Sequence, residues 1–162
     1  MTMHSTPNPL LSPDEERQLE AFVTADTGHG NSITTYTSLE SMFDTLLSDI
    51  AGARHHVHLQ FFKFEDDETS HRIGDALVDR VAEGVETRLL YDDFMCLRWR
   101  NYYRRLAAQG VQTAGFEPVR WTRLRRTNYY RNHRKVVVID GKVAYLGGVN
   151  IADRYLHGLE WF

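Results

Sequence analysis

Hydrophobic residues recur at helical spacing in two stretches in the first half of the chain, and both stretches predict helices that pack by one face. The recurring residues are Leu39, Phe43, Leu46 and Ile50 in the first stretch and Ile73, Leu77, Val81 and Val85 in the second. Thr37 and Glu40 have the spacing of a capping box, which predicts the start of the first helix. A third helix is expected over residues 99–108, with Gly110 as its C-terminal stop.

Strands are predicted where apolar and polar residues alternate and where β-branched residues cluster. The predicted strands cover residues 56–62, 87–91 and 136–139. In the first of them, Val57, Leu59 and Phe61 share one face, while the third leads into Asp140 and Gly141, a strong hairpin signal. Strands that alternate with helices predict an α/β fold, with a mixed, mainly parallel sheet flanked by helices.

A two-residue turn at 140–141 would fix the register of the hairpin. The opposed pairs it predicts are Ile139 with Lys142, Val137 with Ala144, Lys135 with Leu146, His133 with Gly148, and Arg131 with Asn150. Since opposed residues share a face, His133, Lys135 and Asn150 should project together, and Gly148 should leave open space beside the imidazole. A base or nucleophile, a fixed cation, an amide and exposed backbone N–H groups would together form an oxyanion site.

Asp140 receives a different interpretation from the same geometry. It is seven residues from His133, which is roughly 23 Å along an extended strand. An Asp in a tight turn is explained by turn chemistry alone. The register therefore predicts a structural role for Asp140 and no role as a proton carrier.

The spacing of these residues resembles the HKD signature of the phospholipase D superfamily. The matching positions are His133, Lys135, Asp140, Gly147, Gly148 and Asn150. The flanking stretches 64–69, 131–132 and 151–156 are similar to the first HKD half of bacterial cardiolipin synthases. The resemblance covers residues 31–162, so we expect an N-terminal arm over 1–30 and one HKD domain over 31–162.

The resemblance implies the roles of the residues and the partners. His133, Lys135 and Asp140 would be the catalytic members of the signature, while Asn150, Gly147 and Gly148 would bind phosphate, with no metal or cofactor. The family builds one active site from two HKD halves, and this chain carries one copy of the signature. We therefore expect a domain truncated at its C-terminus, near the place where the family carries an acid that orients the His, for which Glu160 is a weak substitute.

Charge is distributed unevenly along the chain. The formal net charge is −3, but residues 98–135 hold eleven Lys or Arg against the single acid Glu117, a net of +10 (11 − 1). A field of this sign attracts phosphate groups of lipids or nucleic acids toward His133. Arg120, Arg123, Arg125 and Arg126 are candidates for contact with an anion or a membrane surface.

Three functions remain open on the sequence. The first is a phosphatidyltransferase of cardiolipin-synthase type that acts on phosphatidylglycerol through a phosphohistidine, present as one half and peripheral to the cytoplasmic face of a bacterial membrane. The second is a phosphodiesterase or nuclease that completes its site by homodimerising. The third is a non-catalytic fragment that binds anionic lipid. The partners would be an anionic phospholipid and a second HKD half or second copy, with nucleic acid as the alternative.

Overall fold

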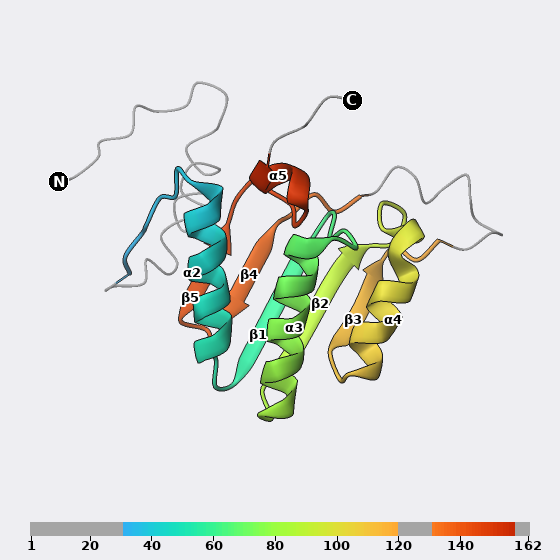
Figure 1. Ribbon diagram of the computed structural model, residues 1–162, viewed down its shortest axis with the longest axis horizontal. Helices are drawn as coiled ribbons and strands as arrows, with labels where there is room; N and C mark the ends of the chain where they lie inside the picture. The colour runs from blue at the N-terminus through green and yellow to red at the C-terminus, as the bar shows by residue number, and fades with distance from the viewer. Residues whose placement is uncertain (1–30, 120–130, 158–162) are drawn as a thin grey trace, which may run out of the picture. The chain divides into compact units, whose positions relative to one another are not determined.

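The computed structural model describes residues 31–119 and 131–157. The chain divides into two units, residues 1–35 and 36–162, and the fold below is that of the second unit. Three helices lie side by side over one face of a sheet (Figure 1). They are α2 (Leu39–Gly52), α3 (Glu68–Ala82) and α4 (Arg100–Ala108), with the short 3-10 helix η1 (Leu97–Trp99) before α4 and α5 (Asp153–His157) near the end.

The sheet contains five strands in the order β3-β2-β1-β4-β5. They are β1 (His56–Phe61), β2 (Glu86–Asp92), β3 (Gln112–Phe116), β4 (Val136–Ile139) and β5 (Val143–Leu146). The first three strands are parallel, whereas β4 runs antiparallel to β1, and β5 runs antiparallel to β4. The predicted α/β class with a mixed sheet is confirmed.

The helices begin and end at residues with an evident capping chemistry. Ser38 caps α2, because its hydroxyl accepts a hydrogen bond from the Ser41 N–H at 3.3 Å. The predicted capping box at Thr37 is therefore wrong by one residue. Gly110 has a φ of +95°, the left-handed conformation in which glycine ends a helix, and its predicted role as the stop after α4 is confirmed.

The hairpin register differs from the prediction by one residue. Asp140 and Gly141 do adopt positive φ, and the Lys142 N–H donates to the Ile139 carbonyl at 2.9 Å. The first pair of the ladder is nevertheless Ile139 with Val143, so Lys142 belongs to the loop. The reason is tertiary: the Asp140 N–H donates to the His56 carbonyl at 3.0 Å, which docks the turn on the start of β1.

Two elements were not predicted, and two helix boundaries were misplaced. Strand β3, which pairs with β2, has the sequence Gln-Thr-Ala-Gly-Phe without apolar alternation, and helix α5 has only five residues, so neither shows a clear hydrophobic period. Val85, assigned to the second helix, lies beyond its end and is buried before β2. The third helix begins at Arg100 after a 3-10 turn, one residue later than expected.

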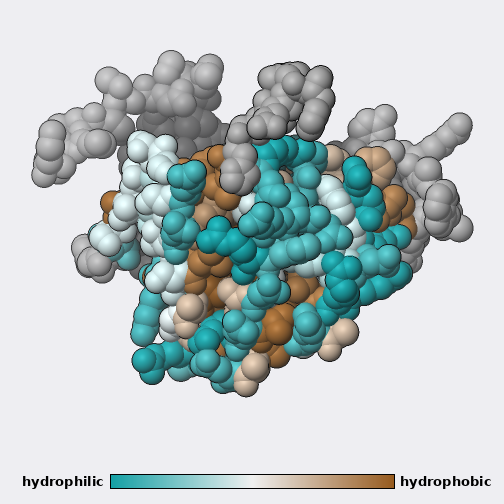
Figure 2. All heavy atoms as spheres, viewed as in Figure 1, coloured by the Kyte–Doolittle hydropathy of each residue, from teal (hydrophilic) through white to brown (hydrophobic). Residues whose placement is uncertain are grey.

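The core lies between the three helices and the sheet. Val57, Leu59 and Phe61 of β1 point into it, as their alternation predicts, and the fully buried Ile73 and Leu77 meet them from α3. The outer surface of the helical layer is largely hydrophilic (Figure 2). Burial of the apolar stripe therefore fixes which way each helix faces.

Gly74 lets α3 and α4 approach closely, and this contact predicts the effect of a substitution. A Cβ at position 74 would fall on the Tyr102 hydroxyl, which donates to the Ser70 carbonyl at 2.7 Å. We expect Gly74→Ala to lower the free energy of unfolding by about 1–3 kcal/mol, the usual cost of overpacking. Urea denaturation of the variant measures the change.

Gly52 provides the matched control, because a Cβ there meets no atom within 4 Å. Gly52→Ala should leave stability unchanged or raise it by up to about 1 kcal/mol through helix propensity. Tyr102→Phe removes the hydroxyl and should recover part of the loss caused by Gly74→Ala. Equal effects of the two alanines would show that the α3–α4 contact does not depend on Gly74.

Candidate active site

The imidazole of His133 lies at the carboxyl end of β1. Its ring stacks on the Phe62 ring, with centroids 3.9 Å apart and planes 21° apart. Phe62 directly follows β1, and His133 precedes β4, the antiparallel neighbour of β1. Because the parallel strands β1, β2 and β3 all end at this edge, His133 occupies the position where open α/β sheets hold their ligands. The imidazole is exposed, so a ligand can reach it.

Lys135 lies on the same aromatic ring. Its ammonium nitrogen is 5.4 Å from the centroid of Phe62 and donates to the His133 carbonyl at 2.6 Å. The ammonium is thereby held beside the backbone of His133 by a cation–π contact and a charge-assisted hydrogen bond. The spacing of one residue between His133 and Lys135 thus places an imidazole and a cation together.

Asn150 reaches this edge through another route than the predicted one. Its Oδ1 accepts a hydrogen bond from the Lys63 N–H at 3.0 Å, and its Nδ2 donates to the Tyr155 hydroxyl at 2.9 Å. The predicted pairing of Asn150 with Arg131 across the hairpin is wrong, because β5 ends at Leu146. Ile151 instead forms a parallel bridge with Phe64 and brings Asn150 beside the end of β1.

Gly147 and Gly148 are exposed, and a Cβ at either position would meet no atom within 4 Å. The predicted open space at Gly148 is therefore present, but the predicted pairing of Gly148 with His133 is wrong, because β4 begins at Val136 and β5 ends at Leu146. These glycines connect β5 to Asn150. His133 and Lys135 lie on the Phe62 ring, and Asn150 accepts from the Lys63 N–H, so all three residues contact the segment Phe62–Lys63. Their roles remain predictions.

Asp140 has the contacts of a structural residue. Its carboxylate accepts backbone hydrogen bonds from Arg54, His55 and His56 at 2.8–2.9 Å, all just before or at the start of β1. These N–H groups, with His56 and Arg54 foremost, lower the pKa of Asp140 to about 2. Asp140 lies at the opposite end of β4 from His133, which agrees with the structural interpretation and not with the catalytic role implied by the signature.

Asp92 and Arg131 form a buried ion pair beside the candidate site. The Arg131 Nη1 lies 3.2 Å from the Asp92 Oδ1, and their side chains are 9% and 0% exposed. Asp92 ends β2 and Arg131 precedes His133 by two residues, so the pair attaches the segment that enters the site to the sheet. Sequence reasoning missed this pair, although two acids in a row at the end of a predicted parallel strand are a usable signal.

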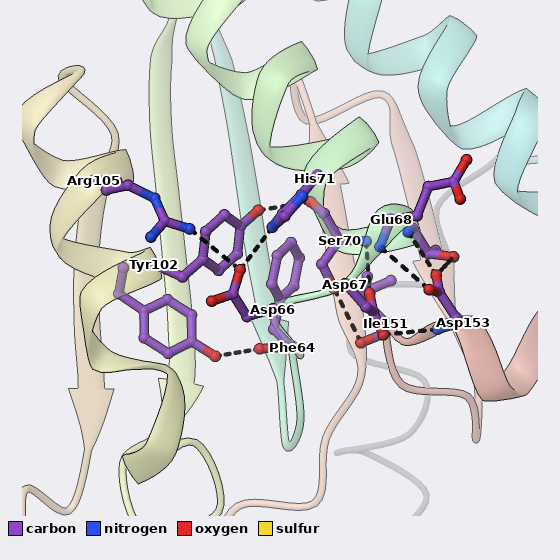
Figure 3. A network of polar contacts seen from close by, with 12 residues as sticks. Phe64, Asp66, Asp67, Glu68, Ser70, His71, Tyr102, Arg105, Ile151 and Asp153 are labelled. Atoms are coloured by element: carbon purple, nitrogen blue, oxygen red, sulfur yellow. Dashed lines mark hydrogen bonds and ion pairs between the residues drawn. The ribbon is translucent and has the colours of Figure 1, made fainter.

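A polar network joins the start of α3 to the start of α5 (Figure 3). Asp67 caps α3 by accepting from the Ser70 N–H at 3.1 Å, and it also accepts from the Asp153 N–H at 2.8 Å. In return, Asp153 accepts from the Thr69 N–H at 2.7 Å and from its hydroxyl at 2.6 Å. The two carboxylates satisfy each other's helix starts and hold the chain that carries Asn150.

Several predicted residues lie outside the described residues. They are Glu160 and the arginines Arg120, Arg123, Arg125 and Arg126. Within 31–119 and 131–157, no group of three His, Cys, Asp or Glu side chains is placed to hold a metal ion. No helix in these ranges has the length and apolar character needed to cross a membrane.

Sequence comparison finds close similarity to one family. The model of the family described as "Cardiolipin synthase, PLD-like domain" matches residues 46–159. A cardiolipin synthase of Oceanobacillus iheyensis is 42% identical over 127 residues, which cover 78% of this chain. The major cardiolipin synthase ClsA of Bacillus subtilis is 38% identical over the same share of this chain. The chain spans 26% of the length of each relative.

Solved structures show the same fold at low sequence identity. NucT from Helicobacter pylori matches with a TM-score of 0.52 and 17% identity, covering 74% of this chain and 73% of NucT. A phosphatidylserine synthase from Haemophilus influenzae matches with a TM-score of 0.53 and 19% identity, covering 74% of this chain and 28% of that one. The phospholipase D family member Nuc from Salmonella typhimurium matches with a TM-score of 0.50 and 20% identity, covering 68% of this chain and 65% of Nuc.

The contacts of Asp140 predict a pH dependence of stability. The pKa of Asp140 is lower in the folded chain than the ordinary aspartate value near ~4, so the ionised carboxylate stabilises the folded chain at pH values above ~4. This stabilisation is lost as the pH falls from ~4 toward 2. We expect Asp140→Asn to lower the thermal midpoint at pH 7 and to lose that part of the acid dependence. Thermal unfolding between pH 2 and 7 measures both effects.

Asp44→Asn is the control for this substitution, since Asp44 is exposed and its pair with Arg72 at 3.3 Å lies on the surface. It should change the midpoint little at any pH. The structural interpretation of Asp140 fails if Asp140→Asn unfolds at the same temperature as the parent chain throughout the range.

The two hydrogen bonds of Asn150 predict a cost in stability. Asn150 is only 5% exposed, so Asn150→Ala leaves the Lys63 N–H without its acceptor in a partly buried place. We expect a loss of about 1–3 kcal/mol in the free energy of unfolding. Asn101→Ala, at an exposed amide of α4, should change it by less than about 0.5 kcal/mol. Urea denaturation measures the free energy of unfolding of both variants. Equal small losses in Asn150→Ala and Asn101→Ala would contradict a structural role of Asn150.

Proposed function

Because the chain belongs to the phospholipase D-like family of cardiolipin synthases, we propose that it is one half of a phosphatidyltransferase active site. The observation that carries the proposal is the placement of His133 and Lys135 on the Phe62 ring at the carboxyl end of β1. An exposed imidazole next to a fixed ammonium suits attack on a phosphodiester, whose non-bridging oxygens are anionic. Phosphatidylglycerol is the proposed substrate, in keeping with the cardiolipin synthases that the chain resembles.

The first step forms a bond between an imidazole nitrogen of His133 and phosphorus. The bond between phosphorus and the oxygen of the leaving glycerol breaks, and the electron pair goes to that oxygen, which takes a proton from an acid. In the second step, a hydroxyl of another phosphatidylglycerol attacks the phosphohistidine, loses its proton to a base and releases His133. The first step replaces a P–O bond by a P–N bond, and the second step replaces the P–N bond by a P–O bond. Neither step needs an oxidant or a metal ion to balance.

Lys135 and the backbone N–H groups near Gly147 and Gly148 are the proposed stabilisers of the phosphoryl oxygens. The open space at both glycines supports this assignment, since a phosphate can approach the backbone there. Asn150, whose amide already bonds to Lys63 and Tyr155, is a candidate for holding this loop as well as for contact with phosphate. Removing one such donor typically costs ~10²–10³ in rate.

The acid that protonates the leaving glycerol is proposed to come from a second HKD half, either in a longer chain or in another copy of this one. Because the proposed substrate is a membrane phospholipid, the working enzyme is also proposed to act on the cytoplasmic face of the membrane as a peripheral protein. A homodimeric phosphodiesterase is the alternative to a two-half transferase. Its support is that the chain carries one copy of the signature, which a second copy of the chain would complement.

Hydrolysis of bis(p-nitrophenyl) phosphate over a range of chain concentrations tests the proposal. This diester needs no acid for its leaving group, because p-nitrophenolate leaves as an anion. We expect release of p-nitrophenolate by the parent chain and none above background with His133→Ala, since the attacking nitrogen is missing. His55→Ala, an exposed His just before β1, is the matched control and should react like the parent.

The concentration dependence separates the two forms of the site. One equivalent of p-nitrophenolate per chain, at any concentration, indicates a half-site that forms the phosphohistidine and lacks the groups for turnover. Turnover that rises faster than linearly with concentration indicates a site completed by a second copy. A reaction that His133→Ala leaves intact contradicts the proposed role of His133.

A further inference from the structure

The loop between β2 and α4 exposes two large apolar side chains. Phe94 is 43% and Leu97 is 39% exposed, although most apolar side chains of this size in the described part of the chain are buried. Arg98 follows them and lies over the Trp99 ring at 5.5 Å from the centroid. Exposed apolar residues that cluster with an aromatic ring and a cation are typical of an interaction surface.

The backbone of this loop is anchored, so the exposure of Phe94 and Leu97 is built into the fold. The Asp92 carboxylate accepts from the Met95 N–H, and the Asp92 carbonyl accepts from the Cys96 N–H, both at 3.0 Å. The Cys96 side chain is fully buried, and its Sγ lies 3.7 Å from the Phe62 carbonyl. With Cys96 fixed inside, Phe94 before it and Leu97 after it remain exposed.

The loop lies on the same edge of the sheet as His133. It begins where β2 ends, next to the end of β1, and Cys96 contacts the backbone of Phe62, on whose ring His133 stacks. The Arg131 guanidinium lies 5.0 Å from the centroid of the Phe94 ring. In Figure 1 the start of α4 and the arrowheads of β2 and β3 lie at this edge.

The charges around the loop are complementary to an anionic surface. Residues 93–105 contain four Arg and one Asp, a net of +3 (4 − 1). The one acid, Asp93, is buried and paired with Arg100 at 2.6 Å, so Arg98 and Arg104 dominate the exposed charge. Apolar and aromatic side chains flanked by Arg are the composition that inserts into the interface of an anionic bilayer.

We propose that the segment Phe94–Trp99, which we call the lipid-contact loop, inserts into the interface of an anionic phospholipid bilayer next to His133. The choice of a lipid partner rests on the proposed function. Insertion of Phe94 and Leu97 below the head groups would place the edge that carries His133 at the depth of the lipid phosphates. A nucleic acid would match the charge and could stack on Phe94, but it would leave the aliphatic Leu97 in water, whereas a bilayer interface removes both apolar side chains from water.

Sedimentation with vesicles of phosphatidylglycerol and phosphatidylcholine tests the proposal. We expect the full chain to bind, and Phe94→Asp with Leu97→Asp to weaken binding about tenfold or more, since two apolar side chains no longer leave water. Val143→Asp is the matched control: Val143 is 37% exposed but adjoins the turn at the opposite end of the sheet. Circular dichroism establishes that each variant is folded.

A fluorescent probe gives a second measurement that does not depend on the Asp variants. Cys96 is the single cysteine and is buried, so a thiol introduced by Phe94→Cys reacts selectively with an environment-sensitive dye. The emission should shift to shorter wavelength when vesicles are added, and the same dye at Val143→Cys should not shift.

Each result has a clear meaning. No binding by the parent chain, equal binding by the loop and control variants, or no shift of the dye at position 94 overturns the proposal. A selective loss of binding to a single-stranded oligonucleotide, with vesicle binding unchanged, would assign the loop to nucleic acid instead. Vesicle binding is measured apart from hydrolysis, so a failure of the proposed chemistry would leave this test interpretable.

Discussion

The candidate site depends on the pairing of two later segments with the end of β1. On one side, β4 runs antiparallel to β1 and brings His133 onto the Phe62 ring; on the other, Ile151 bridges to Phe64 and brings Asn150 onto the Lys63 N–H. These contacts join residues more than seventy positions apart in the sequence. The short segment Phe62–Phe64 therefore contacts the imidazole of His133, the ammonium of Lys135 and the segment that carries Asn150. Burial of β1 in the core sets the position of this segment.

Carboxylates near this segment pair with buried groups of the fold, so the exposed end of the sheet remains basic. Asp92 neutralises Arg131 inside the protein, Asp93 neutralises Arg100, and Asp67 and Asp153 cap each other's helices. A buried charge is tolerated only when it is paired or hydrogen-bonded, so each of these acids fixes the position of a partner. These carboxylates already have partners inside the protein. His133, Lys135 and Arg98 lie toward the surface, where an anionic phosphodiester can reach them.

The sequence predicted what depends on local period and on the family signature, and it failed where distant parts of the chain decide. The faces of β1, α2 and α3 followed from the spacing of Val57, Phe43 and Leu77. The hairpin turn was placed at Asp140, but its register shifted because Asp140 is bound to the backbone of 54–56, which no local rule contains. Phe62 and Asp92 were missed for the same reason, since each becomes part of the site only through contacts across the sheet.

We propose that His133 is the nucleophile of a half-site at the end of β1. The most direct test of this role is mass spectrometry of the chain after brief reaction with bis(p-nitrophenyl) phosphate and a quench in base, where phosphohistidine survives. We expect one p-nitrophenyl phosphoryl group on the peptide that contains His133. A phosphoryl group on another residue, or an unmodified His133 peptide from folded chain that has released one equivalent of p-nitrophenolate without turnover, would contradict this role of His133.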